Sequence, residues 1–271
     1  SGYVDLVHRK AYRWDGNKDV EIEIPAELSS EVARRRDQLL EAAAEADDDV
    51  LAKYLDGEEI SDPELEACLR KGVKESILAP VLVGSAATGS GLRAILDAFI
   101  RYLPSPADEA PATATDHAGA SVPVAPDADG PLLVRIFKTA ADPFVGRLTY
   151  LRVLSGTLHS QAHAWNSTHR EDERIGQLLL LHGKEQEAIG ELKAGEIGAV
   201  AKLSATATGD TLCDRDKALL LPPLEFPKPT LMVAIEPQTK ADLDKMGPAL
   251  QRMLEEESTA RLERSDAGEQ V

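Results

Sequence analysis

The clearest hydrophobic pattern in the chain lies in residues 137–156, which predict a β-hairpin. The pair Asp142-Pro143 interrupts the first extended run, because proline fixes φ and cannot donate to a strand ladder. Gly146 then opens a second run whose two faces both carry apolar side chains, as expected of a strand buried on both sides. One face of this run holds Leu148, Tyr150, Arg152 and Leu154, and the other holds Thr149, Leu151 and Val153.

The surrounding segment, 131–222, repeats this pattern in short pieces separated by turn residues. Runs of this length and spacing predict a small antiparallel β-barrel that is closed or nearly closed. The extended runs are 132–139, 146–154, 163–166, 173–182, 197–203 and 210–212.

The N-terminal part, 1–108, predicts a strand pair around Asp15-Gly16 followed by helices. Two helices are expected near 26–45 and 47–55. A third begins at Ser61, with Glu64 three residues later, which is the signature of a capping box.

A strand–loop–helix unit follows in the same part of the chain. The apolar run 77–83 predicts a strand of a parallel sheet, and 92–103 predicts a helix. Its Leu92, Ile95, Leu96, Phe99 and Ile100 are expected to face a core. Nothing before residue 77 supplies enough parallel strands to flank such an apolar strand, so we expect the chain to be an internal piece of a longer one.

The remaining segments complete a predicted domain division. Residues 109–130 are rich in Ala, Pro, Asp, Thr and Gly, contain no Lys or Arg, and predict a linker without a core of its own. Residues 223–271 predict a strand at 230–236, a helix from Thr239 to about Glu257 and a further extended run, which together form half of a β-α-β unit. The expected fold class is therefore an α+β multidomain chain.

Charge is unevenly distributed along the 271 residues, whose formal net charge is −17. The formal net charge is −9 in 1–108, −4 in 109–130, zero in 131–222 and −4 in 223–271. A nucleic-acid contact normally needs Lys and Arg on phosphates, so 131–222 could carry one and the other segments hardly could. Charge alone favours the plainer alternative, a barrel that is neutral on average.

The composition disfavours membrane proteins, secreted proteins and metal-binding proteins. Cys68 and Cys213 lie far apart and predict reduced thiols in a cytoplasmic protein. No run of about 18 apolar residues predicts a membrane span, and no secretory leader is recognisable. His159 and His163 flank a predicted hairpin turn, where a spacing of four has no special value for zinc, so no metal site and no catalytic residue is expected.

Six stretches of the chain resemble elongation factor G, in the order in which that family carries them. DPFVGRLTYLRVLSGTL (142–158) is similar to the start of its second domain, TGDTLCD (208–214) to a later barrel turn, and FPKPTLMVAIEPQTKADLDKM (226–246) to the entry of its third domain. VDLVHRKAY (4–12), AEADDDVLAKYLDGEEI (44–60) and GSA (84–86) resemble its GTPase domain.

This resemblance implies a fold and a function. It implies a partial α/β GTPase domain with a helical insert in 1–108, a β-barrel second domain in 131–222 and a partial ferredoxin-like third domain in 223–271. Gly84, Ser85 and Ala86 match the loop that closes over the guanine base. The implied longer protein binds GTP and magnesium and couples GTP hydrolysis to movement of tRNA and mRNA on the ribosome.

The departures from the family are equally specific. The sequence contains no G-x-x-x-x-G-K-[ST] phosphate loop, no magnesium-binding Asp-x-x-Gly after a strand before Gly84, and no Asn-Lys-x-Asp. Phosphoryl transfer needs a phosphate cradle, a metal and a positioned water. We therefore expect this chain to need no cofactor and neither to bind nor to hydrolyse GTP. Residues 179–184 depart from the family's usual sequence, which indicates a diverged paralogue.

The resemblance also suggests contact residues and partners. Arg147, Arg152 and Arg174 are candidates for ribosomal RNA contact, although exposed strand charges are the plainer explanation. The segment Asp142, Pro143 and Phe144 is a candidate interface between barrel and GTPase domain. The partners implied are small-subunit RNA for the barrel and a basic or stalk protein for the acidic insert, with the chain itself a monomer.

Three other functions stay open at the level of sequence. The longer protein could serve ribosome recycling, ribosomal protection or peptide release. A non-catalytic ribosome-binding module is the alternative of a different class. A free-standing adaptor is disfavoured by the two incomplete β-α-β units.

Overall fold

The computed structural model describes residues 2–142 and 146–263, which fall into two compact units, Ser1–Ser105 and Pro106–Val271. The first unit opens with an antiparallel sheet of strands β1 (Gly2–Asp5), β2 (Lys10–Trp14) and β3 (Asp19–Ile22) in the order β1-β2-β3. The predicted turn pair Asp15-Gly16 joins β2 to β3. Asp15 shapes it by accepting hydrogen bonds from the N–H groups of Asn17 and Lys18.

The helices of the first unit are η1 (Ala26–Leu28), α1 (Ser29–Ala44), α2 (Asp48–Leu55), α3 (Asp62–Lys74) and α4 (Leu92–Tyr102). Two of them, α2 and α3, start at capping side chains. Asp47 caps α2 through the N–H groups of Asp49 and Val50. Ser61 and Glu64 form the predicted capping box of α3.

A small core holds the helices of this unit together. Its buried members come from the β1–β2 turn, α1, α3 and α4, and Leu65 is its most deeply buried large side chain. The remaining buried members are Val7, Ala43, Ile60, Cys68, Leu69, Ala98 and Tyr102.

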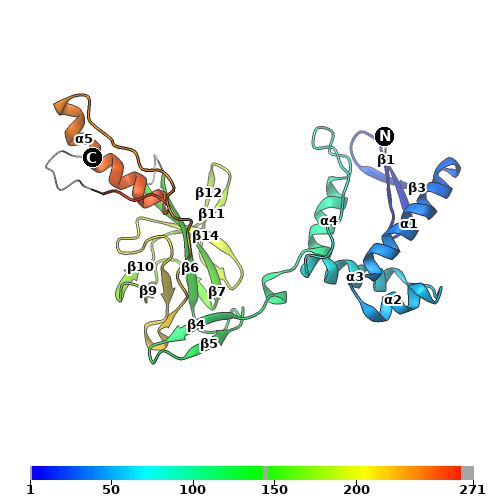
Figure 1. Ribbon diagram of the computed structural model, residues 1–271, viewed down its shortest axis with the longest axis horizontal. Coiled ribbons are helices and arrows are strands. Elements are labelled where there is room, and N and C mark those ends of the chain that lie inside the picture. Colours follow the sequence, from blue (N-terminus) through cyan, green and yellow to red (C-terminus); the bar gives the residue numbers. More distant parts are fainter. Residues whose placement is uncertain (1, 143–145, 264–271) are drawn as a thin grey trace. The chain divides into compact units, whose positions relative to one another are not determined.

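The second unit is built around an antiparallel β-barrel (Figure 1). Eight strands pair in the order β10-β9-β15-β6-β7-β14-β11-β12. Their bounds are β6 (Leu133–Asp142), β7 (Gly146–Ser155), β9 (His163–Asn166), β10 (Glu171–Arg174), β11 (Leu178–His182), β12 (Glu185–Ile189), β14 (Ile197–Ala201) and β15 (Thr211–Cys213). A further pair joins β8 (Thr157–His159) to β13 (Glu191–Lys193), and η3 (Arg215–Lys217) follows β15.

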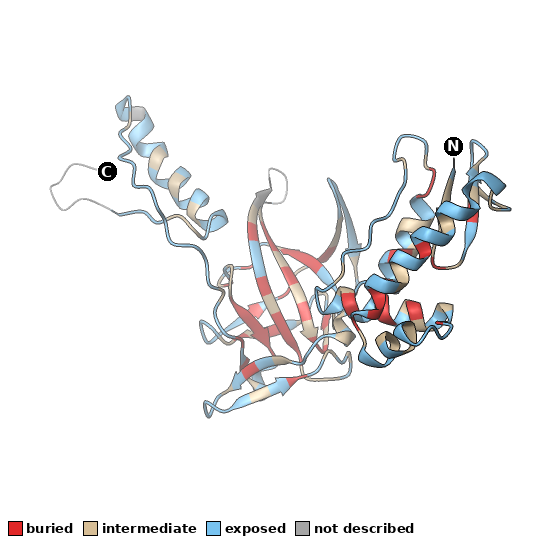
Figure 2. Cartoon of the chain, turned by 45° about the vertical axis from the view of Figure 1, so that its right-hand side comes forward, coloured by how far each residue is buried: buried red, intermediate tan, exposed pale blue. Residues whose placement is uncertain are grey.

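The inner face of the barrel is filled by Leu, Ile and Val, as Figure 2 shows by the buried positions in red along its strands. Period-two alternation places Val134 and Ile136 of β6, and Leu151 and Val153 of β7, in this core. The hairpin β6–β7 is therefore its central element, and the predicted antiparallel barrel is confirmed, while its exact limits at 131 and 222 stay a prediction.

The prediction of a structureless linker at 109–130 is wrong for much of that segment. After η2 (Pro106–Asp108), strands β4 (Ala112–Asp116) and β5 (Ser121–Val124) form a hairpin that pairs with β16 (Leu219–Leu220). Ala114 and Val124 are buried against Leu133 of the barrel. The segment is ordered because its small apolar residues alternate and use the barrel wall as their core.

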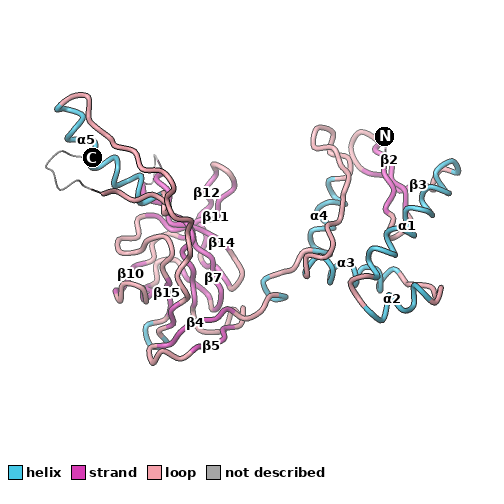
Figure 3. Tube along the Cα trace, in the orientation of Figure 1, coloured by secondary structure: helices cyan, strands magenta, loops and turns pink. Residues whose placement is uncertain are grey.

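The predicted strand at 77–83 is also wrong, since this stretch forms no ladder in the structure (Figure 3). Most of its apolar side chains are exposed, Val81 at 91%, whereas Leu78 packs against the core of the first unit. A strand needs a hydrogen-bonded neighbour, and none of the described residues supplies one.

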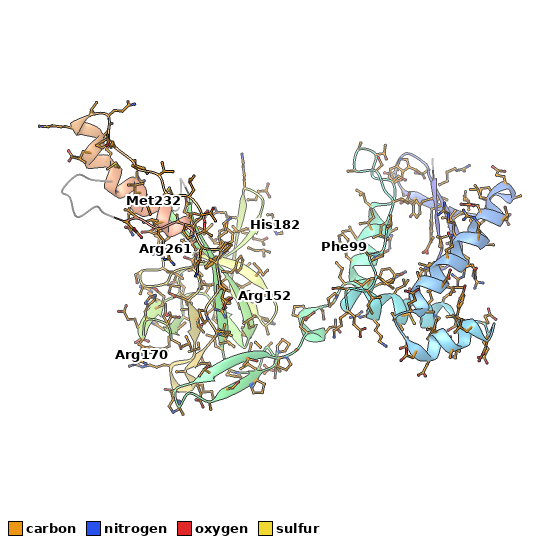
Figure 4. All side chains as sticks on the ribbon, viewed as in Figure 1. Phe99, Arg152, Arg170, His182, Met232 and Arg261 are labelled. Carbon is orange, nitrogen blue, oxygen red and sulfur yellow. The ribbon has the colours of Figure 1, made fainter. Side chains whose placement is uncertain are left out.

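The face expected to bury α4 was also assigned wrongly. Leu92, Leu96, Phe99 and Ile100 are exposed and Ile95 is half-buried, while Ala98 and Tyr102 on another face are buried. Phe99 is labelled on its helix in Figure 4. Within the described part of the unit, α4 packs through its small and aromatic side, against α3.

The C-terminal part of the second unit repeats this situation. Residues 230–236 form no strand, and Met232 is 83% exposed, for the same lack of a ladder partner in the described part of the chain. The predicted helix is α5 (Lys240–Glu256), capped by Thr239, whose hydroxyl accepts from the Asp242 N–H.

Candidate functional site

The loop of Gly84, Ser85 and Ala86 is closed by its own backbone. The Ser85 N–H donates to the Ser90 carbonyl at 2.8 Å, and the Gly89 N–H donates to the Ser85 carbonyl at 2.8 Å. A Cβ on residue 84 would lie 2.7 Å from Cδ1 of Ile95 and 3.2 Å from the Ser90 carbonyl oxygen, so a larger residue there would have to displace the Ile95 side chain. The loop is therefore compact and tied to the start of α4.

Asp19 anchors this loop although it lies far from it in sequence. Its carboxylate accepts from the Gly91 N–H at 2.9 Å and from the Ser90 hydroxyl at 3.3 Å. The Tyr3 hydroxyl lies 3.5 Å from the same carboxylate, and burial together with the charge of Asp19 raises the pKa of Tyr3 to about 12. An acidic group at a helix N-terminus is favoured by the helix dipole. Sequence reasoning missed Asp19, since no local pattern links residues 19 and 91.

The three candidate arginines do not come together. Arg147 and Arg152 both lie on β7 but are five positions apart, so they point to opposite faces of the sheet. Arg147 donates to the Thr206 carbonyl and so binds the loop between β14 and β15. Arg174 is exposed on β10, which lies four strands from β7 in the sheet order.

Arg152 has unexpected neighbours on the outer face of the barrel. The β6–β7 register places it opposite Arg135, and places Tyr150 opposite Lys138. The Lys138 ammonium lies 5.8 Å from the centre of the Tyr150 ring. Sequence reasoning missed Arg135 and Lys138. They lie three positions apart and come to one face only because of the register shift between Ile136 and Lys138, which no sequence pattern indicates.

A polar cluster joins β10 to the loop between β14 and β15. The carboxylate of Glu173, a residue only 2% exposed, accepts from Ser204 N–H and Oγ, from Ala205 N–H and from Thr206 Oγ1 at 2.7–3.0 Å. Burial alone would raise the pKa of Glu173, but these hydrogen bonds outweigh it and lower the pKa. The cluster is structural, because both carboxylate oxygens are satisfied by the loop that they hold.

The remaining candidate residues show no assembled chemistry. Asp142 ends β6, while Pro143 and Phe144 lie outside the described residues, so the proposed domain interface stays a prediction. His159 lies 3.5 Å from Glu191, and no group of three or more potential metal ligands occurs among the described residues. Within the same residues, no helix combines the length and apolarity that crossing a membrane requires.

The residues that are present supply little of what GTP binding requires. The Ser85 N–H, one of the groups that the resemblance assigns to the guanine base, is already bonded within its loop. The sequence offers no phosphate loop beside it. No chemical step through a nucleotide is therefore derived for this chain.

Comparison with known proteins identifies the barrel and the segment after it. Residues 131–215 match the family model of elongation factor G domain 2, and residues 226–271 match that of Elongation Factor G, domain III. The chain is also similar to a crystal structure from Thermus thermophilus, at 31% sequence identity and a TM-score of 0.76. That match covers 97% of this chain and 37% of the Thermus chain, so the present chain spans little more than a third of its relative. The chain is therefore an elongation-factor-G-like protein chain whose barrel is domain 2 of that family.

Proposed function

We propose that this chain is a ribosome-binding part of a translational GTPase of the elongation factor G type. In the proposal, the longer protein acts in the cytoplasm and couples GTP hydrolysis to movement of tRNA and mRNA. The observation that carries it is the domain 2 match on residues 131–215. This match lies in 131–222, the one of the four segments of the sequence in which acidic and basic residues are equal in number. Such a surface can approach RNA phosphates at less electrostatic cost than the acidic remainder.

The acidic first unit has a separate role in this proposal. The formal net charge of −9 in residues 1–108 suits a basic or stalk-type protein of the ribosome better than it suits RNA. The barrel and the acidic unit would then contact different components of one particle.

The proposal is tested by sedimenting the full chain with purified bacterial ribosomes. We expect the chain to pellet with ribosomes and to be released as salt rises, because phosphate contacts exchange for counterions. A chain that stays in the supernatant at low salt would refute ribosome binding.

We further propose that the chain by itself neither binds nor hydrolyses GTP. The missing phosphate and magnesium motifs and the internally bonded Ser85 N–H support this. Calorimetry with GTP and magnesium should give no binding heat, and an affinity in the micromolar range would contradict the proposal. Any GTPase activity would then belong to the longer protein.

A recycling, protection or release factor would share these properties. Binding should therefore be measured separately to isolated small subunits and to the stalk proteins. Binding to only one of the two would separate these roles from binding to the ribosome as a whole. A purely non-catalytic module is favoured if the longer protein also fails to hydrolyse GTP on ribosomes.

A further inference from the structure

The stretch of chain before α5 exposes its apolar side chains and leaves its backbone unpaired. Leu231 is 80% exposed, Met232 83% and Val233 65%, and Met232 is labelled in Figure 4. None of the N–H groups from residue 228 to residue 236 donates a backbone hydrogen bond within the described part of the chain. We call this stretch the 228–236 segment. Free backbone groups beside exposed apolar side chains are a template for pairing with another strand.

The 228–236 segment has the alternation of a strand with one apolar face. In an extended chain, side chains two positions apart share a face. The odd-numbered positions are all apolar: Pro229, Leu231, Val233 and Ile235. The even-numbered positions carry one charge at each end of the segment: Lys228 and Glu236. Burying the odd-numbered face would therefore remove apolar surface from water without burying a charge.

Three prolines leave only one edge of this segment suited to pairing. In a strand, the N–H and C=O groups of one residue point to the same edge, and those of the next residue point to the opposite edge. Pro227, Pro229 and Pro237 are all odd-numbered, and proline has no N–H to donate. The even-numbered edge keeps all its donors, whereas the odd-numbered edge is interrupted at both ends. Pairing should therefore stop at two strands and not extend into a fibre.

The two charges of the segment fix the direction and the register of pairing. Lys228 and Glu236 lie at equal distances in sequence from Met232. When two copies pair antiparallel with Met232 opposite Met232, Lys228 of each copy stands opposite Glu236 of the other. Parallel pairing in register would instead set like charges opposite each other. The antiparallel register also makes the even-numbered residues the hydrogen-bonded pairs, so every proline stands where no N–H is needed.

We propose that the 228–236 segment binds a second copy of this chain by antiparallel strand pairing centred on Met232. The pairing is a two-fold symmetric contact in which each copy supplies the charges that the other needs. A strand of any other protein would have to carry an acidic and a basic residue at this same spacing. A two-stranded ribbon alone is marginally stable, and the exposed Leu243 and Met253 of α5 supply apolar side chains that can pack on it. This proposal departs from the monomer that the sequence suggested.

The test is sedimentation equilibrium of the full chain across the micromolar concentration range. The mean mass should rise with concentration from that of one chain towards that of two. Met232→Lys should weaken dimerisation at least about tenfold, because the two-fold axis sets the two introduced ammonium groups directly opposite each other.

A charge exchange tests the register. Glu236→Lys should weaken dimerisation about fivefold or more, because it sets two like-charge pairs across the ribbon. Lys228→Glu/Glu236→Lys restores both opposite-charge pairs and should bring the dissociation constant back to within about twofold of the original. In a parallel pair, Glu236→Lys would only replace one like-charge pair by another, so an unchanged dissociation constant for this variant would overturn the antiparallel register.

A matched control adds the same charge to another exposed apolar stretch. Val81→Lys lies in the first unit and should leave the dissociation constant within about twofold of the original. Val81 and Met232 are both exposed, so neither lysine should lower the melting temperature of the chain. Thermal unfolding thus separates an effect on pairing from an effect on folding.

Each outcome decides the proposal. A chain that stays monomeric at every concentration overturns it. Association that Val81→Lys weakens and Met232→Lys does not would assign the contact to the first unit and also overturn it. Growth beyond two chains would show that the prolines do not restrict pairing to one edge, and would overturn the two-stranded contact.

Discussion

At the scale of single residues, buried charges in this chain are matched by dedicated partners. Arg36 donates to the carbonyls of Leu6 and Val7 at 2.5 Å each and to Asp62 at 2.6 Å. Glu173 is the acidic counterpart in the barrel. Both side chains fix a loop to a regular element, so the loop depends on one charge in each case.

Glu173→Gln is expected to destabilise the barrel by about 2–3 kcal/mol at neutral pH, since an amide NH₂ would face donors that now bind a carboxylate oxygen. Urea unfolding of this variant should be compared with that of Glu171→Gln, an exposed position on the same strand that should change stability by less than about 0.5 kcal/mol. Equal stabilities for the two variants would show that the cluster contributes little.

The lowered pKa of Glu173 also fixes the sign of a pH dependence. Its stabilisation is present above the unfolded glutamate value of about 4.3 and is lost as pH falls through the lower value in the fold. The original chain should therefore lose more stability than Glu173→Gln between neutral pH and pH about 3. Parallel losses in both chains would contradict this assignment.

Arg36→Gln should cost about 2–3 kcal/mol, because it leaves two carbonyls and the Asp62 carboxylate without their shared cation. Arg34→Gln is the natural control, as Arg34 is exposed and pairs only with Glu31 on its own helix among the described residues. Of the three consecutive arginines, Arg34 and Arg35 are exposed and pair with Glu31, whereas Arg36 is buried. The measurement is chemical unfolding of the first unit, followed by the fluorescence of Trp14.

At the scale of helices and strands, local sequence signals were sufficient to predict where an element begins, whereas contacts between distant residues could not be predicted. Ser61 and Thr239 predicted their helix starts through side-chain capping, and β9 has the predicted limits, His163–Asn166. Short strands such as β8, β13 and β16 escaped prediction because two or three residues carry no usable periodicity.

The candidate site shows the same limit. The loop of Gly84 to Ala86 was placed correctly between an extended segment and α4, but its anchor Asp19 lies in β3 and depends on tertiary folding. The three arginines were proposed for RNA contact without the strand parity that separates Arg147 from Arg152. A register prediction for the β6–β7 hairpin would have been needed to add Arg135.

Asp19→Ala should free the loop before α4 from the N-terminal sheet, at a cost of about 1–2 kcal/mol, which is typical of a lost helix-terminus acceptor. Hydrogen exchange by NMR should show the Gly91 amide losing protection. Glu21→Ala, on the same strand but exposed, should leave that amide unchanged. Retained protection of Gly91 in Asp19→Ala would mean that the loop holds its position without the carboxylate.

At the scale of the whole molecule, burial and charge divide the chain in different ways. The barrel encloses its own core, whereas the stretch 77–83, one face of α4 and the stretch 230–236 leave large apolar side chains exposed. Surfaces of this kind mark places where other polypeptide packs. Charge balance and the domain 2 match both fall on the barrel, which is why we assign ribosome contact to it.

The most direct test of this account is hydrogen–deuterium exchange of the full chain, measured alone and with saturating ribosomes. The account predicts that ribosomes slow exchange most in peptides covering the barrel, since backbone opening there is coupled to the bound surface. Unchanged exchange throughout 131–222 in the presence of bound ribosomes would contradict it.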